Sequence, residues 1–383
     1  MIISYQNLIN IFFFLYIISS QFYFYPGGAL QHSHIFFAIF SLFLLFFSIK
    51  RKINLSFLNY YTFIGLFLFY AFFLNLYYSF LYQEVAFLVA TLHFFVGIYI
   101  ALNVSLYLFY VNSIKFFQTS LFISLFLLFF FFIFEIGNYD FLPRYNAFFY
   151  GPAQMAHWVL CIFACYGLII KELVPAKGKV MFIFIFFLTL TLVLASGTRS
   201  AYLSILFMFF GGLLTLSEKK IIKNIYAFIS FFIILISILL INKDMLQATY
   251  ERFISFDLNT QLTVRGYSRI YDYYEYLLFG SGQGLDERFY LASSIFDGVY
   301  TEYSFEIHST FVAILFYYGI FGFIFFFYFI FKIFKNLDFR QKIFFLIPFF
   351  YSLTTYNART PIFWFFIGVS IFISAKNFKN KQL

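Results

Sequence analysis

The chain has 383 residues, of which 63% are hydrophobic and only 11% are charged. Soluble domains carry roughly 45–50% apolar and about 25% charged residues, so this composition excludes a soluble globular enzyme, a disordered chain and a disulfide scaffold. The net charge is +9, from 25 Lys and Arg against 16 Asp and Glu. In a membrane protein such an excess of basic residues is first explained by the positive-inside rule, because basic residues gather on the cytoplasmic side. It is therefore no indication of nucleic-acid binding by itself.

Hydrophobic segments recur along the whole chain and are separated by polar breaks. A membrane-spanning helix needs about 20 mostly apolar residues, and lipid offers no hydrogen bonds to an open backbone, so each segment is predicted to be a helix. Twelve segments qualify: 3–20, 35–49, 57–79, 85–110, 116–135, 153–170, 180–195, 200–216, 222–242, 309–331, 341–356 and 360–375. We expect a single integral membrane domain over residues 1–383, whose first helix is retained because it lacks a signal-peptide pattern.

Basic residues are unevenly divided between the two sides of this arrangement. One side carries 17 of the 25 cations, and 15 of those 17 are Lys. The positive-inside rule makes that side cytoplasmic, together with both termini. The opposite side carries one Lys and seven Arg: Arg144, Arg199, Arg252, Arg265, Arg269, Arg288 and Arg359. Topology needs only positive charge, whereas the planar fork of Arg suits phosphate or carboxylate; pairing with external acids is the alternative.

The long external loop predicted at residues 243–308 joins the ninth and tenth spans. Loops of this length are usually functional or disordered, and the lack of a low-complexity run favours order. Residues 263–278 are predicted to form an amphipathic helix, because Arg265, Arg269 and Asp272 recur at helical spacing. Two Arg at i and i+4 repel unless an anion lies beside them, and either Asp272 or a diphosphate could be that anion.

Motifs of nucleotide and metal chemistry are missing from the sequence. There is no phosphate-binding P-loop, no HExxH and no Cys/His cluster, so we expect no metal and no cofactor. Cys161 and Cys165 lie one helical turn apart within a span and are expected to pack. Ion-coupled transporters carry buried charges at mid-membrane, and these are scarce here, although a lipid-linked oligosaccharide flippase remains an alternative of another class.

Three outward segments carry residues suited to chemistry. Residues 196–200 (Ser-Gly-Thr-Arg-Ser) form a turn ahead of a span, which predicts either an anion site at a helix start or a plain polar turn. Residues 282–284 (Gly-Gln-Gly) would let the backbone approach a ligand closely. His308 and Ser309 precede a span at the membrane boundary, which suits proton transfer near neutral pH; a helix cap followed by packing glycines is the alternative.

Together these motifs resemble the O-antigen polymerase and O-antigen ligase superfamily. The pattern of His308-Ser309, nine residues, and then Gly319-x-x-Gly322 is similar to a late motif of that family. Residues 196–201 resemble its Ser-Gly-Ser/Thr-Arg turn, and residues 265–284 resemble its Arg and Gly-x-Gly segment. The resemblance covers about residues 190–325 in motif and the whole chain in topology.

The resemblance implies a GT-C-like, all-helical glycosyltransferase of the bacterial inner membrane, with an active site facing the periplasm and no metal. It implies that Arg199 with Arg265 or Arg269 holds the diphosphate of an undecaprenyl-diphosphate-linked glycan. It also implies that His308 acts as the general base, and we expect Glu306 to orient it. Weaker candidates for substrate binding are Gly282, Gln283, Gly284, Ser309 and Arg359.

Two activities share these motifs. A polymerase of O-antigen, or of another surface polysaccharide, joins carrier-linked repeat units, whereas a ligase transfers the glycan to lipid A-core in lipopolysaccharide biosynthesis. The sequence around His308 and the Phe-rich spans look more similar to a polymerase, and the ligase is the alternative. A cell-wall glycan polymerase of the shape, elongation and division type fits the motif spacing less well. The partners implied are the lipid-linked glycan and membrane lipid. A chain-length regulator protein is a further possible partner, and no nucleic-acid partner is expected.

Overall fold

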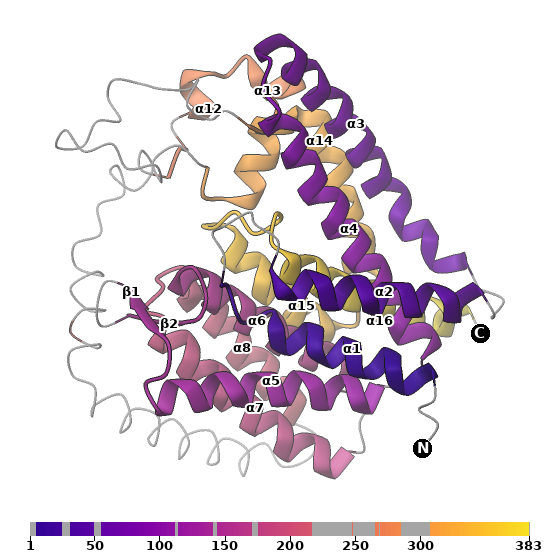
Figure 1. Ribbon diagram of the computed structural model, residues 1–383, viewed down its shortest axis with the longest axis vertical. Coiled ribbons are helices and arrows are strands. Elements are labelled where there is room, and N and C mark those ends of the chain that lie inside the picture. Colours follow the sequence, from indigo (N-terminus) through magenta and orange to yellow (C-terminus); the bar gives the residue numbers. More distant parts are fainter. Residues whose placement is uncertain are drawn as a thin grey trace.

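The computed structural model describes residues 5–24, 31–49, 55–111, 114–140, 144–170, 175–216, 247, 265–267, 269–284 and 307–382. Helices dominate these ranges (Figure 1). The long ones are α1 Tyr5–Ser19, α2 His32–Ile49, α3 Tyr61–Tyr82, α4 Ala86–Tyr110, α5 Ile114–Ile133, α6 Pro152–Ile169, α7 Pro175–Ala195, α8 Ala201–Leu216, α14 Thr310–Lys335, α15 Phe339–Ser352 and α16 Pro361–Gln382. A short 3-10 helix, η1 Leu55–Tyr60, leads into α3.

The predicted spans coincide with these helices. Eleven of the twelve predicted segments correspond to α1–α8 and α14–α16, and the ninth, 222–242, lies outside the described residues. Within the described residues, seven helices are long and apolar enough to cross a membrane by length and composition, and α1, α7 and α8 contribute shorter apolar stretches. The prediction of a helical, multi-pass membrane protein is therefore confirmed.

Helices α6 and α16 form the most enclosed part of the bundle, since 89% and 72% of their apolar windows are buried. Small residues allow close approach there: a Cβ on Gly97 of α4 would lie 2.2 Å from the Trp364 ring of α16. The Ser105 hydroxyl donates to the Gly368 carbonyl across the same contact at 2.9 Å. Such small residues and hydroxyl bonds are typical of helix packing in membranes, where lipid competes with apolar contacts.

Helix α1 begins and helix α16 ends on the same side of the molecule, at the right of Figure 1. The opposite side carries a short antiparallel hairpin of β1 Asn138–Asp140 and β2 Arg144–Ala147. The two small helices α12 Arg269–Asp272 and α13 Tyr276–Phe279 lie next to the start of α14 on that side as well. The hairpin was not predicted, because its strands are too short for a period-2 pattern to be read.

The predicted amphipathic helix over 263–278 is wrong as one continuous element. In the described residues, a turn at 265–267 precedes α12, and a further turn at 273–275 separates α12 from α13. Gly266 has a φ of +71°, which a helix does not accept, and the following aromatic residues have weak helix propensity. Arg265 and Arg269 therefore do not share the face of one helix.

Candidate functional site

The loop between α15 and α16, residues 353–360, joins several segments that are far apart in sequence. The Arg265 Nη1 donates to the Thr354 carbonyl at 2.7 Å, and the Tyr267 hydroxyl donates to the Leu353 carbonyl at 3.2 Å. The Thr310 amide donates to the Thr355 carbonyl at 3.2 Å. These bonds bring the Arg265 segment and the start of α14 to one place. We call the residues there, Arg265, Tyr267, His308 and Ser309, the Arg265 cluster.

His308 lies directly beside Arg265. Its amide donates to the Arg265 carbonyl at 3.1 Å, and its side chain is half-buried. Ser309 is the N-cap of α14, because its hydroxyl accepts from the Val312 amide at 3.4 Å. The cap predicted as an alternative role is therefore real, and it fixes the backbone that carries the histidine. Glu306, expected to orient His308, lies outside the described residues.

Tyr267 is a member of this cluster that the sequence did not single out. Burial raises the pKa of its phenol above the ordinary value, and the opposing influences are the Arg265 charge and hydrogen bonds with Arg265 and Ser309. A raised pKa keeps the phenol protonated at neutral pH. Tyr267 thus supports Arg265 and Ser309 as a neutral hydrogen-bonding group.

The turn at residues 196–200 is held tightly by its own side chains. The Ser196 hydroxyl donates to the Val193 carbonyl at 2.6 Å and interacts with the Thr198 hydroxyl at 3.0 Å. Gly197 has a φ of +57°, which favours glycine. Arg144 from β2 crosses this turn, and its Nε donates to the Ser196 carbonyl at 3.1 Å. Arg199 is half-buried at the end of the turn, directly before α8.

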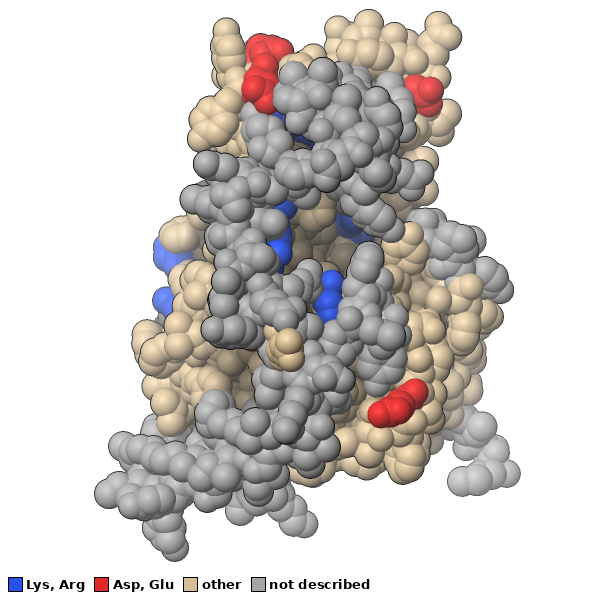
Figure 2. Space-filling model, turned by 90° about the vertical axis from the view of Figure 1, so that its left-hand side faces the viewer, with Lys and Arg blue, Asp and Glu red and all other residues tan. Residues whose placement is uncertain are grey.

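Tyr351 connects this turn to the Arg265 cluster. Its hydroxyl donates to the Ala153 carbonyl at 2.7 Å, and the side chains of Thr198 and Ser200 lie near it. Both Arg144 and Arg265 lie close enough for their charges to act on it. The segment that carries Arg199 and the segment that carries Arg265 thus both lie near Tyr351. Figure 2 shows Lys and Arg side chains around a central hollow on the side that carries the hairpin.

Arg269 occupies a different environment from its predicted counter-ion. Its side chain is only 4% exposed, whereas Asp272 is exposed. The two side chains therefore face different surroundings, and Asp272 does not share the burial of the guanidinium. A buried guanidinium is stable only with hydrogen bonds or an anion around it, so diphosphate binding by Arg269 stays a prediction.

The Gly-Gln-Gly segment packs against a break in α14. Gly319 has a φ of +62° inside this helix, and its added Cβ would lie 2.5 Å from the Leu278 carbonyl oxygen. The carbonyls that the break exposes are satisfied from outside: the amides of Ser281 and Gly282 donate to Phe316 and Tyr317 at 3.1 and 2.9 Å. The segment is thus fixed in place, next to but not within the Arg265 cluster.

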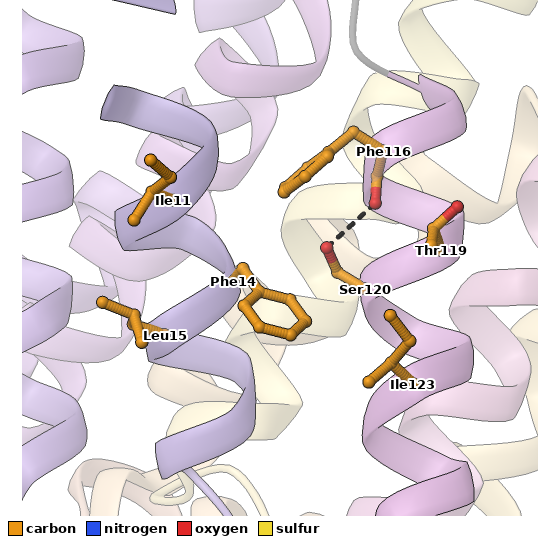
Figure 3. Close-up of a pocket in the computed structure, with 7 residues that line it drawn as sticks. All are labelled: Ile11, Phe14, Leu15, Phe116, Thr119, Ser120 and Ile123. Atoms are coloured by element: carbon orange, nitrogen blue, oxygen red, sulfur yellow. Dashed lines mark hydrogen bonds between the residues drawn. The ribbon is translucent and has the colours of Figure 1, made fainter. Parts of the chain in front are cut away.

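A separate groove between α1 and α5 has none of this chemistry. It has a volume of about 280 Å³ and is lined by Ile11, Phe14, Leu15, Phe116, Thr119, Ser120 and Ile123 (Figure 3). The Ser120 hydroxyl donates to the Phe116 carbonyl of its own helix at 2.9 Å. The groove therefore presents apolar surface, and we do not assign the reaction to it.

Of the remaining candidates, Arg359 is exposed, and its Cζ lies 5.7 Å from the centre of the Tyr356 ring. The buried Cys161 and Cys165 are free thiols, which confirms their packing role. His157 lies near Cys161 and stacks on Tyr351. Among the residues that the structure describes, no group of three or more acidic, Cys or His side chains could hold a metal ion.

Comparison with known proteins finds one family model that matches part of the chain. Residues 184–327 match the family model described as O-antigen ligase. The match covers a little over a third of the chain and contains α8, Arg199, Arg265, Arg269 and His308. No curated protein matches the chain. The resemblance to the O-antigen polymerase and ligase superfamily is therefore confirmed, over the part of the chain that carries its motifs.

Proposed function

We propose that the protein is an O-antigen or surface-polysaccharide polymerase that joins undecaprenyl-diphosphate-linked repeat units on the periplasmic face of the bacterial inner membrane. The observation that carries the proposal is the main-chain hydrogen bond from the His308 amide to the Arg265 carbonyl, together with the bond that holds the Arg265 guanidinium to the α15–α16 loop. This bond supports the proposal because it joins the two chain segments that carry a base and a guanidinium, the two groups that glycosyl transfer from a diphosphate requires.

The reaction has one bond-making and one bond-breaking event at the anomeric carbon. The acceptor hydroxyl oxygen attacks that carbon, and the bond from the carbon to the diphosphate oxygen breaks with inversion. The electron pair leaves with the diphosphate, whose developing charge is met by Arg265 and Arg199. Fixed donors aimed at developing charge are usually the largest contribution to catalysis, and they can act there without a metal.

His308 takes the proton of the attacking hydroxyl in this proposal. A histidine is half neutral near its ordinary pKa and can accept a proton at neutral pH. Its position just before the cap of α14 supports this role, because the sequence predicts the membrane boundary at the start of that helix. Arg269 supports the same positive region from its buried position, and Glu306 is proposed to orient the imidazole.

The ligase activity is a second candidate, because the matching family model carries that description. Both activities use the same donor and differ in the acceptor, so the same residues serve either. The topology proposed for both places the two termini in the cytoplasm, in agreement with α1 starting and α16 ending on one side (Figure 1).

The glycan profile of a deletion strain separates the two activities. Loss of a polymerase leaves single repeat units on lipid A-core, whereas loss of a ligase leaves long chains on the carrier. Complementation with the wild-type gene should restore long chains on the cell surface. An unchanged profile in the deletion strain would contradict both activities.

A further inference from the structure

A second polar cluster lies on the other side of the α15–α16 loop, around Gln283. The hydroxyls of Tyr356 and Tyr318 both donate to the Gln283 Oε1, at 2.7 and 2.9 Å. The Gln283 amide donates to the Asn75 Oδ1 at 2.9 Å. The side-chain oxygen and the main chain of Gln283 are therefore both fixed.

This arrangement leaves the donor end of the carboxamide for another molecule. A Gln side chain has one acceptor oxygen and an NH2 group with two N–H donors, and two phenols already satisfy the oxygen. No described residue accepts a hydrogen bond from the Gln283 Nε2, and the side chain is half-buried. A few fixed polar donors at a partly enclosed position are typical of small-ligand sites.

The support behind Gln283 is rigid. Asn75 and Tyr318 are fully buried, and the Asn75 Nδ2 donates to the Thr91 hydroxyl at 2.8 Å. Gly282 has a φ of +68°, and an added Cβ would lie 2.6 Å from the Tyr78 ring. Precise binding needs ligand-contacting side chains whose rotamers are held by such packing and hydrogen bonds.

A basic group lies at the edge of this cluster. The Arg359 guanidinium lies over the ring of Tyr356 and is exposed. N–H donors together with a guanidinium suit the hydroxyl, acetamido and carboxylate groups of sugars.

We propose that Gln283 and Arg359 form a second subsite, which binds the saccharide of the acceptor substrate. This inference rests on the proposed function, because an enzyme that joins two glycans must hold an acceptor saccharide beside the donor diphosphate. The α15–α16 loop serves both subsites. Thr354 binds Arg265, and Tyr356, two residues later, binds Gln283.

The test measures binding of two probes to the full-length protein in lipid nanodiscs. One probe is the repeat-unit oligosaccharide released from the surface glycan of the source strain, and the other is undecaprenyl diphosphate without sugar. Gln283→Glu removes both N–H donors but keeps an oxygen that can accept from Tyr318 and Tyr356. We expect oligosaccharide affinity to fall about tenfold or more, the scale of one or two lost hydrogen bonds, and undecaprenyl diphosphate affinity to stay unchanged.

Two further variants complete the design. Arg265→Lys is the matched control and should weaken undecaprenyl diphosphate while sparing the oligosaccharide. Arg359→Ala, at an exposed position, should weaken oligosaccharide binding without disturbing the fold. It keeps the test valid if the thermal unfolding midpoint shows that Gln283→Glu is destabilised.

Three outcomes would overturn the second subsite: no oligosaccharide binding by the wild type, unchanged binding by both Gln283→Glu and Arg359→Ala, or equal loss of both probes. A wild type that binds the oligosaccharide through Gln283 but does not bind undecaprenyl diphosphate would instead count against the proposed function alone.

Discussion

The two sides of the α15–α16 loop hold their arginines differently. Arg265 is half-buried, and its guanidinium is anchored to the Thr354 carbonyl. Arg359 is exposed and lies over the ring of Tyr356. An anchored charge needs no rearrangement when negative charge develops in a transition state, whereas an exposed one can follow substrates of varied shape. The comparison shows that one short loop contacts a half-buried, anchored arginine and also carries an exposed one, and the proposed division between chemistry and recognition rests on that difference.

The largest effect is expected for His308→Ala, which tests whether the side of the loop that holds Arg265 carries the chemistry. We expect chain extension to fall by about 10²–10⁴-fold, the usual contribution of a general base, while the protein still inserts in the membrane. The measurement is the glycan ladder of a complemented deletion strain, with protein level checked in membrane fractions. His32→Ala, at another exposed histidine, is the matched control and should leave the ladder intact. Normal long chains in the His308 variant would refute the assignment of the base.

Arg265→Lys tests whether glycan transfer depends on the planar, two-pronged geometry of the guanidinium. Lys keeps the charge but has no planar fork, so it cannot bind the Thr354 carbonyl and a diphosphate in the same geometry. We expect the rate of glycan transfer to fall by about 10²-fold, near the loss seen on removing one oxyanion donor. Arg359→Lys is the paired substitution on the other side of the loop and should cost far less in rate. If the two variants behave alike, the two sides do not differ as we infer.

Arg199→Lys addresses the turn beside the first side of the loop. Because Arg199 is half-buried directly before α8, we expect a loss of about tenfold in transfer rate, as for one charge-assisted hydrogen bond. Lys115→Arg, at an exposed position on the predicted cytoplasmic side, serves as the control. Free replacement of Arg199 by Lys would show that the turn does not grip the diphosphate.

Tyr356→Phe should have the smallest effect. It removes one of two hydrogen bonds to the Gln283 Oε1 and leaves the bond from Tyr318. One hydrogen bond of this kind contributes about 1 kcal/mol, which limits the loss of oligosaccharide affinity to about fivefold. Tyr274→Phe, where the side chain is 72% exposed, is the control. A larger loss for undecaprenyl diphosphate than for the oligosaccharide would assign Tyr356 to the other side of the loop.

The helices and their order could be predicted because lipid imposes a simple rule on the sequence. Eleven predicted segments match described helices, since long apolar runs have no other stable form in a bilayer. The helix at 263–278 failed because the prediction used side-chain periodicity alone. Gly266 adopts a left-handed φ there, and the aromatic residues that follow pack against α14 instead of extending one helix, as the contact of Tyr276 with Phe316 shows.

Several members of the site could not be found from the sequence. Tyr267 and Tyr351 carry no motif, and the sequence placed Arg144 among the outward arginines without indicating its contact with the turn at residues 196–200. Arg144 binds a residue 52 positions away, and Arg265 binds one 89 positions away. A sequence pattern reports neighbours along the chain, whereas these contacts depend on how the helices pack.

The sequence by itself indicated a helical, multi-pass membrane protein, a set of arginines predicted to face outward, and the position of His308 and Ser309 at the start of a helix. Composition and charge suffice for these features, because the membrane separates apolar from charged residues by a large free-energy difference. Only the tertiary structure decided that the α15–α16 loop joins Arg265 to one side and Gln283 to the other. These contacts of the loop consist of single hydrogen bonds and close approaches at glycines. Packing geometry sets them, and they produce no periodic pattern in the sequence.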